Sequence, residues 1–166
     1  MKKKNKTVAF LGLCTALAMI LSYVEVLLPP LFPAVPGIKM GLANIVIIFL
    51  LYRNGAVSAL CVSLVRIILV SMLFSNMMAF LYSVAGALLS LGVMALLCRL
   101  NFLSPTGVSV AGGVTHNLGQ VLVAMLLLDT SELFYYMAVL TVTGTLAGIL
   151  VGVCGSILVK KVPRIF

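Results

Sequence analysis

The segment Gly112-Gly-Val-Thr-His-Asn-Leu-Gly-Gln120 lies inside an apolar run from about residue 108 to 128, and it decides how the chain folds. It holds the only histidine of the sequence, His116, with Asn117 beside it and Gln120 four residues later. On a helix, residues three or four apart share a face, and the two glycines that open the segment lie one turn earlier on the same arc. Polar groups this deep in hydrocarbon are costly and face a partner or a water-filled cavity. We therefore expect the other helices to surround this polar face.

The composition of the whole chain indicates an integral membrane protein. Of the 166 residues, 63% are hydrophobic and 8% are charged, which leaves too little polar surface for a soluble domain of this length. The 11 lysines and arginines outnumber the 3 acids, but most of them cluster in residues 2–6 and 160–164. Such clusters flank membrane spans and orient them, so they do not indicate nucleic-acid binding. We predict one integral domain over residues 1–166, multi-pass, in the plasma membrane.

Six apolar segments are long enough, or nearly so, to cross the bilayer, which takes roughly 20 apolar residues. The expected fold is an all-α membrane protein, a six-transmembrane-helix bundle. The second segment is short and starts beside Gly37 and Gly41, so we expect it to be tilted or partly re-entrant. The predicted helices cover approximately residues 7–28, 38–53, 54–74, 78–99, 108–129 and 133–158.

The charges between these segments predict the orientation in the membrane. If both termini are cytoplasmic, the basic loop residues fall inside and the acids fall outside, as the positive-inside rule requires. Only Lys39 and Arg66 break this pattern. The residues that obey it are Arg53, Arg99, Lys160, Lys161 and Arg164 on the cytoplasmic side and Glu25, Asp129 and Glu132 on the outer side.

Polar residues from four segments gather in the predicted outer half of the bundle, whereas the inner half has almost none. At a rise of about 1.5 Å per residue, Asn44 lies about 9 Å below the outer surface, Arg66 about 12 Å, Gln120 about 14 Å and His116 about 20 Å. This asymmetry predicts a pocket that opens outward and has His116 as its floor. The candidate substrate-binding residues are Glu25, Lys39, Asn44, Arg66, His116, Asn117 and Gln120.

Each of these residues also has a structural alternative. Arg66 could pair with Glu25, with its long side chain extended outward. His116 could be a core histidine bonded to a backbone carbonyl. Asn44 could join two helices, and Lys39 could face lipid headgroups. Only their joint placement favours a binding site.

The charges of the pocket favour an anionic or amphipathic ligand. Arg66 and Lys39 outweigh Glu25, and neutral amides surround them. A flavin, a quinone precursor, a prenyl phosphate or a vitamin would each suit such a site.

An enzymatic role is not expected. The sequence has no Walker A, HExxH or GxSxG motif and no adjacent carboxylates, so we expect neither catalysis nor ATP hydrolysis. The four cysteines lack CxxC spacing and are expected to be small buried hydrophobes, so we predict no metal site. A lone histidine cannot hold a haem by two axial bonds, and no cofactor is predicted.

Two rows of small residues predict close helix packing. Gly144, Gly148 and Gly152 form the stronger row, in the last segment. It serves either packing within the bundle or docking onto another membrane subunit. Gly12 and Ala16 form a weaker row in the first segment and are the candidate subunit-docking residues.

Several blocks of the chain resemble the Gx transporter family, which also carries the name heptaprenyl diphosphate synthase component I. The likeness covers nearly the whole chain, and the PGxKxGLAN and HNxGQ blocks are specific. The family is similar to the substrate-binding S-components of energy-coupling factor (ECF) transporters. The blocks are Leu21–Glu25, Pro36–Asn44, Arg66, Gly107–Ser109 and His116–Gln120.

This resemblance implies a bundle of six helices with an outward-facing ligand pocket. It also implies docking of the first helix onto a membrane coupling protein that carries two ATPases, which would power uptake. Gly12-x-x-x-Ala16 stands where the family usually has Ala-x-x-x-Ala. The second family name implies an alternative role, as a non-catalytic membrane component that assists a prenyltransferase in isoprenoid or menaquinone metabolism.

Overall fold

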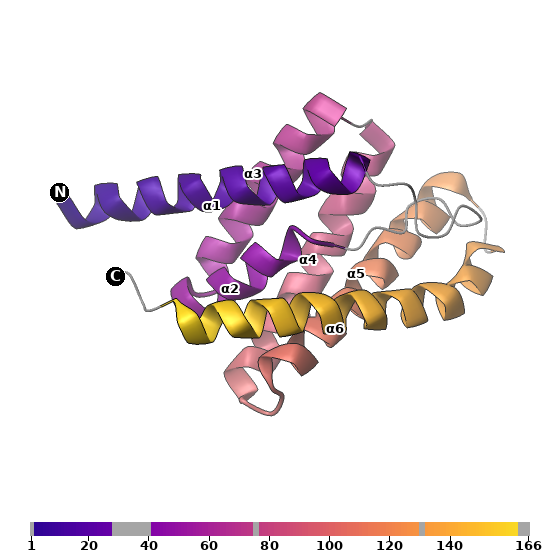
Figure 1. Cartoon of the computed structure of the whole chain (residues 1–166). Coiled ribbons are helices and arrows are strands. Elements are labelled where there is room, and N and C mark those ends of the chain that lie inside the picture. The colour runs from indigo at the N-terminus through magenta and orange to yellow at the C-terminus, as the bar shows by residue number, and fades with distance from the viewer. Residues whose placement is uncertain (1, 28–40, 75–76, 130–131, 163–166) are drawn as a thin grey trace.

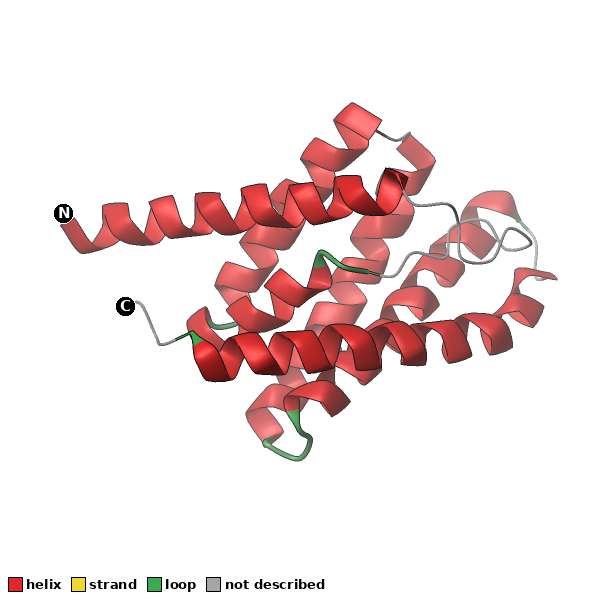
Figure 2. Ribbon diagram, viewed as in Figure 1, coloured by secondary structure: helices red, strands yellow, loops and turns green. Residues whose placement is uncertain are grey.

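A computed structural model describes residues 2–27, 41–74, 77–129 and 132–162, and helices make up all of their regular secondary structure (Figures 1 and 2). The all-α membrane bundle expected from the sequence is confirmed. In chain order the elements are α1 (Lys2–Leu27), α2 (Asn44–Asn54), α3 (Ala56–Phe74), α4 (Met77–Leu100), α5 (Pro105–Leu128), the 3₁₀-helix η1 (Glu132–Tyr136) and α6 (Met137–Lys161).

Within these residues, five helices rather than six are long and apolar enough to span a membrane. The exception is α2, whose 11 residues extend for about 16 Å, roughly half of a 30 Å hydrocarbon core. It was predicted to begin at residue 38 but begins at Asn44, and residues 38–40 lie outside the described part. The expectation that this segment would be unusually short therefore agrees with the structure.

A glycine turn explains where α2 begins. Gly41 has φ +69°, a left-handed conformation that side chains with a Cβ rarely adopt. The amide of Asn44 donates to the Gly41 carbonyl at 2.8 Å, and the amide of Leu42 donates to Glu25 Oε1 at 3.0 Å. The turn is thus fixed both by its own backbone and by α1.

The helices surround a central space in the order α3, α4, α5, α6 and α2, and α1 packs against α3 and α2. The start of α1 and the end of α6 lie at the same end of the bundle (Figure 1, left). We call this the proximal end. The opposite end, where α5 meets η1, is the distal end.

Glycines bring α5 and α6 into backbone contact. A Cβ atom on Gly148 would lie 2.6 Å from the Cα of Val110, and one on Gly152 would lie 2.7 Å from the Cα of Thr106. Real Cβ atoms do not approach so closely, so only glycine fits. Of the two alternatives for this small-residue row, packing within the bundle is the one that the structure shows.

The opposite side of α5 meets α4 in the same way. A Cβ atom on Gly119 would lie 2.9 Å from the Ala85 carbonyl oxygen, and one on Gly86 would lie 2.8 Å from the His116 carbonyl oxygen. Because α5 is held closely on both sides, its polar face is fixed toward the middle of the bundle.

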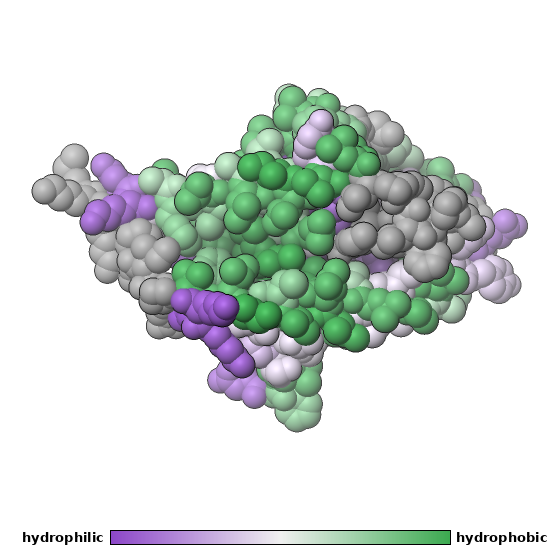
Figure 3. Space-filling view, in the orientation of Figure 1, coloured by the Kyte–Doolittle hydropathy of each residue, from purple (hydrophilic) through white to green (hydrophobic). Residues whose placement is uncertain are grey.

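Apolar side chains cover most of the visible outer surface, and hydrophilic residues gather toward its ends (Figure 3). This surface suits contact with lipid. Of the four free cysteines, Cys14 is buried as expected. The expectation was wrong for Cys61, which is exposed on α3, because an apolar residue on the lipid-facing side of a membrane helix needs no burial in protein.

Candidate functional site

A cavity of about 770 Å³ lies inside the bundle, and every helix contributes to its wall. Its size is within the range of small-molecule sites, roughly 300–1,000 Å³. The structure brings together around it six of the seven residues proposed from the sequence, and the seventh, Lys39, lies outside the described residues. The six are Glu25, Asn44, Arg66, His116, Asn117 and Gln120.

Arg66 supplies a positive charge in the wall formed by α3. Its Nη1 donates to Ser22 Oγ of α1 at 3.2 Å. Its Nε is buried, with no hydrogen-bond partner among the residues described. The Glu25 carboxylate acts on Arg66 electrostatically, but the hydrogen bond of the guanidinium is to a neutral hydroxyl, so it can still bind an anion.

Glu25 lies one turn beyond Ser22 on α1 and has a different partner. Its Oε1 accepts from the backbone amide of Leu42, which ties α1 to the turn before α2. Both Glu25 and Arg66 are described, and no ion pair within 4 Å joins them; Arg66 bonds to Ser22 instead. The alternative in which Arg66 and Glu25 form a direct structural pair is therefore not what the structure shows.

The polar face of α5 has both binding and structural partners. His116 and Gln120 lie on one side, as the spacing of four predicts: a Cβ on Gly86 of α4 would lie 3.0 Å from His116 Cε1 and 2.9 Å from Gln120 Cγ. Asn117 faces α6, where its Nδ2 donates to the Leu140 carbonyl at 2.7 Å. Asn117 thus fixes α5 against α6 as well as lining the cavity.

The cavity does not end at His116. Its lining continues one and two turns further along α5, to Gly112 and Ser109, and includes Ser90 and Met94 of α4. The predictions that His116 forms the floor and that the inner half has almost no polar groups were therefore wrong. Sequence analysis missed these serines because a serine in an apolar helix usually bonds to its own backbone and signals nothing.

Asn44 also lies deeper than its predicted depth of about 9 Å, a depth that assumed a helix starting at residue 38. The neighbouring Ile45 and Ile48 contact Gly155, in the last third of α6. Because α2 begins only at Asn44, the start of this short helix lies deep in the bundle rather than near its distal surface.

The distal end of the cavity is apolar and aromatic. Leu128 at the end of α5 and Leu133 and Tyr136 of η1 line it there, while Tyr135 is 84% exposed. Amphipathic aromatic rings are typical of the boundary between membrane and water. We did not predict these residues, although the sequence Glu132-Leu-Phe-Tyr-Tyr136 carries this signal.

The candidate docking residues lie on the outer face of α1. Gly12 and Ala16 are both exposed, and a Cβ added to Gly12 would meet nothing within 4 Å. This face is open to another helix or to lipid, and its docking role stays a prediction.

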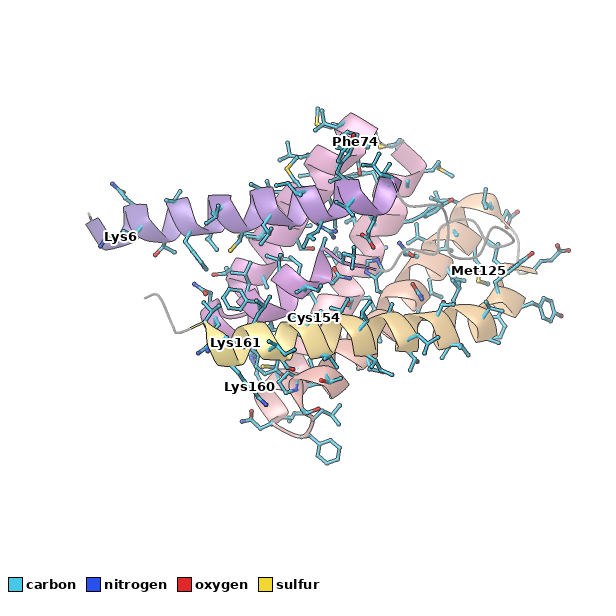
Figure 4. The ribbon with its side chains drawn as sticks, in the orientation of Figure 1. Lys6, Phe74, Met125, Cys154, Lys160 and Lys161 are labelled. Atoms are coloured by element: carbon cyan, nitrogen blue, oxygen red, sulfur yellow. The ribbon has the colours of Figure 1, made fainter. Side chains whose placement is uncertain are left out.

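The charged ends of the bundle follow the predicted asymmetry. Lys6, Lys160 and Lys161 lie toward the proximal end (Figure 4). Asp129 and Glu132 are exposed at the distal end, beside the aromatic rim. The side of the membrane that each end faces stays a prediction.

The family model for heptaprenyl diphosphate synthase component I matches residues 14–158. The chain belongs to this family. The component I match confirms the resemblance seen in the sequence and includes the entire described cavity lining, from Ser22 to Val151. Comparison with curated proteins and with solved structures gave no significant match.

Proposed function

We propose that this protein is a substrate-binding membrane subunit of the ECF type, similar to an S-component. It captures a small anionic or amphipathic molecule from outside the cell for uptake driven by partner ATPases. The observation that carries this proposal is the cavity of about 770 Å³ with Arg66 in its wall. The role that we propose is binding rather than catalysis, since the sequence has only three acidic side chains and no catalytic motif.

The anionic character of the ligand follows from the partners of Arg66. Ser22 stabilises the guanidinium by one neutral hydrogen bond, and Glu25 is occupied by the Leu42 amide. Glu25 acts on Arg66 only through space, so a ligand carboxylate or phosphate could form the direct charge-assisted bonds that the guanidinium lacks. The amide groups of Asn44 and Gln120 would bind uncharged polar atoms of the same molecule.

Energy for uptake must come from other subunits in this proposal, because the sequence has no nucleotide-binding motif. The exposed row of Gly12 and Ala16 offers a smooth helix surface for a membrane coupling protein. That protein would in turn carry the ATPase subunits.

Native mass spectrometry of the purified protein in detergent tests the binding role. We expect a small-molecule adduct on the wild type that is lost from Arg66→Gln, because a charge-assisted hydrogen bond contributes about 1.5–3 kcal/mol, roughly ten- to a hundred-fold in affinity. Arg99→Gln, exposed near the end of α4, is the matched control and should keep the adduct. A wild type without any adduct, or an adduct that Arg66→Gln retains in full, would contradict the proposal.

A second candidate function is supported by the description of the matched family. As component I of a heptaprenyl diphosphate synthase system, the chain would assist a separate prenyltransferase rather than import a ligand. Affinity purification from membranes separates the two roles. Recovery of a prenyltransferase whose activity depends on this chain favours the second role, and recovery of a membrane coupling protein with ATPases favours the first.

A further inference from the structure

The deep end of the cavity, on the side away from η1, is polar although apolar helices enclose it. Ser90 of α4 and Ser109 of α5 line this part of the cavity. Ser109 packs against α6, because a Cβ added to Gly152 would lie 2.9 Å from the Ser109 Cβ. Helix contacts thus bring polar groups from two helices to one end of the space.

The two serine hydroxyls lack the partner that such groups usually have. Thr115, Thr143 and Thr145 each donate to the carbonyl four residues earlier, at 2.7, 3.1 and 2.8 Å, which is the common arrangement in helices. In residues 41–74, 77–129 and 132–162, Ser90 and Ser109 form no hydrogen bond. They are only 5% and 4% exposed, so the cavity is where a partner can reach them.

Gly112 keeps this end of the cavity open. A Cβ at this position would lie 3.2 Å from Ser90 Oγ and 2.8 Å from Met94 Cγ. Any larger residue would cover the hydroxyl and fill the space beside it. The glycine therefore leaves Ser90 accessible from inside the cavity.

We propose that Ser90 and Ser109 bind an uncharged polar group at the far end of the same ligand that Arg66 binds by its anionic group. The ligand is then polar at both ends and does not insert a plain hydrocarbon chain into the bundle. This inference rests on the proposed binding function and narrows its substrate class. A hydrocarbon tail would leave two buried hydroxyls without partners, which is unfavourable.

Decanoate and 10-hydroxydecanoate form a matched pair of probes, because they differ only in a terminal hydroxyl. Each carboxylate can bind Arg66, and only the second probe can bond to the serines. Titration of the wild type in lipid nanodiscs, read by native mass spectrometry, should give about ten-fold tighter binding for 10-hydroxydecanoate. Partition into lipid removes more decanoate than 10-hydroxydecanoate from solution, so both affinities are calculated from the measured free concentration of each probe.

The double variant Ser90→Ala/Ser109→Ala should remove this preference while leaving the binding of decanoate unchanged. Ser58→Ala is the matched control, since Ser58 bonds to the Asn54 carbonyl and lies outside the cavity lining; it should keep the ten-fold preference. The comparison of the two probes on the wild type needs no variant, so poor folding of the double variant would not prevent the test.

The proposal of a ligand that is polar at both ends would be overturned by any of three results. These are equal binding of the two probes, tighter binding of decanoate, or binding of neither probe. A preference that survives in the double variant would also overturn it. The broader binding role is judged separately, because it depends on the endogenous adduct that Arg66→Gln should lose. An adduct that depends on Arg66, together with no preference between the probes, would refute this inference alone.

Discussion

The roles of Arg66 and Glu25 can be tested separately, because the two side chains have different hydrogen-bond partners. Arg66 bonds to Ser22 and Glu25 to the Leu42 amide, so Arg66→Gln should lower ligand affinity about ten- to a hundred-fold with little loss of stability. Glu25→Gln should instead loosen the turn before α2. Ligand affinity and thermal unfolding of both single variants and the double variant provide the measurement. A stability loss in Arg66→Gln that Glu25→Gln restores, with affinity unchanged, would support a structural ion pair instead.

Gly41 gives a prediction about the backbone alone. Its φ of +69° makes Gly41→Ala unfavourable by about 1–2 kcal/mol, and a Cβ there would also lie 3.1 Å from Asn44 Nδ2. We expect a lower thermal midpoint in detergent. Gly92→Ala is the control: its added Cβ meets nothing within 4 Å, and alanine favours a helix interior by about 0.8–1.0 kcal/mol. The prediction fails if both variants shift the midpoint in the same direction.

Among the helices, the contact between α5 and α6 depends most clearly on glycine. Gly148→Leu would force a side chain into the backbone of Val110, 2.6 Å from a Cβ at this position, and overpacking of this kind costs about 1–3 kcal/mol or more. Thermal unfolding and size-exclusion profiles should both show the damage. Gly92→Leu places the same side chain on the open face of α4 and should change stability by about 0.5 kcal/mol or less. Similar behaviour of the two variants would mean that α5 and α6 are not this close.

Helix existence could be predicted from the sequence more reliably than helix position. Apolar runs identified all six α-helices, and the ends of α3 and α4 differ from the predicted ends by at most two residues. The start of α2 was wrong because hydropathy continues through Gly41, whereas the chain direction changes there through a left-handed residue. A hydropathy pattern contains no signal for such a turn beyond the glycine itself.

The whole molecule has basic residues at one end and acidic residues at the other, which predicts its orientation. In a cysteine-free background, Glu132→Cys at the distal end should react with an impermeant thiol reagent added outside the cell. Asn101→Cys, exposed between α4 and α5 at the other end, should react only after the membrane is opened. Labelling of Asn101→Cys in intact cells, with Glu132→Cys protected, would reverse the orientation.

Counting residues along single helices predicted some cavity-lining residues of the candidate site but not others. His116 and Gln120 were placed correctly on one face because they belong to the same helix. The deep position of Asn44 could not be predicted, since it depends on how far α2 is shifted along α6. Ser90 and Ser109 were missed for a related reason: their importance comes from two helices meeting at Gly112, and no single segment shows that.

The size of the cavity also has a consequence for hydration. A space of about 770 Å³ has room for about 25 water molecules at roughly 30 Å³ each. A molecule that fills the site must release most of them, so the measured affinity depends on the activity of water as well as on direct contacts. Osmolytes such as sucrose, which are excluded from the cavity, lower the activity of water. They would therefore strengthen ligand binding without contacting the protein.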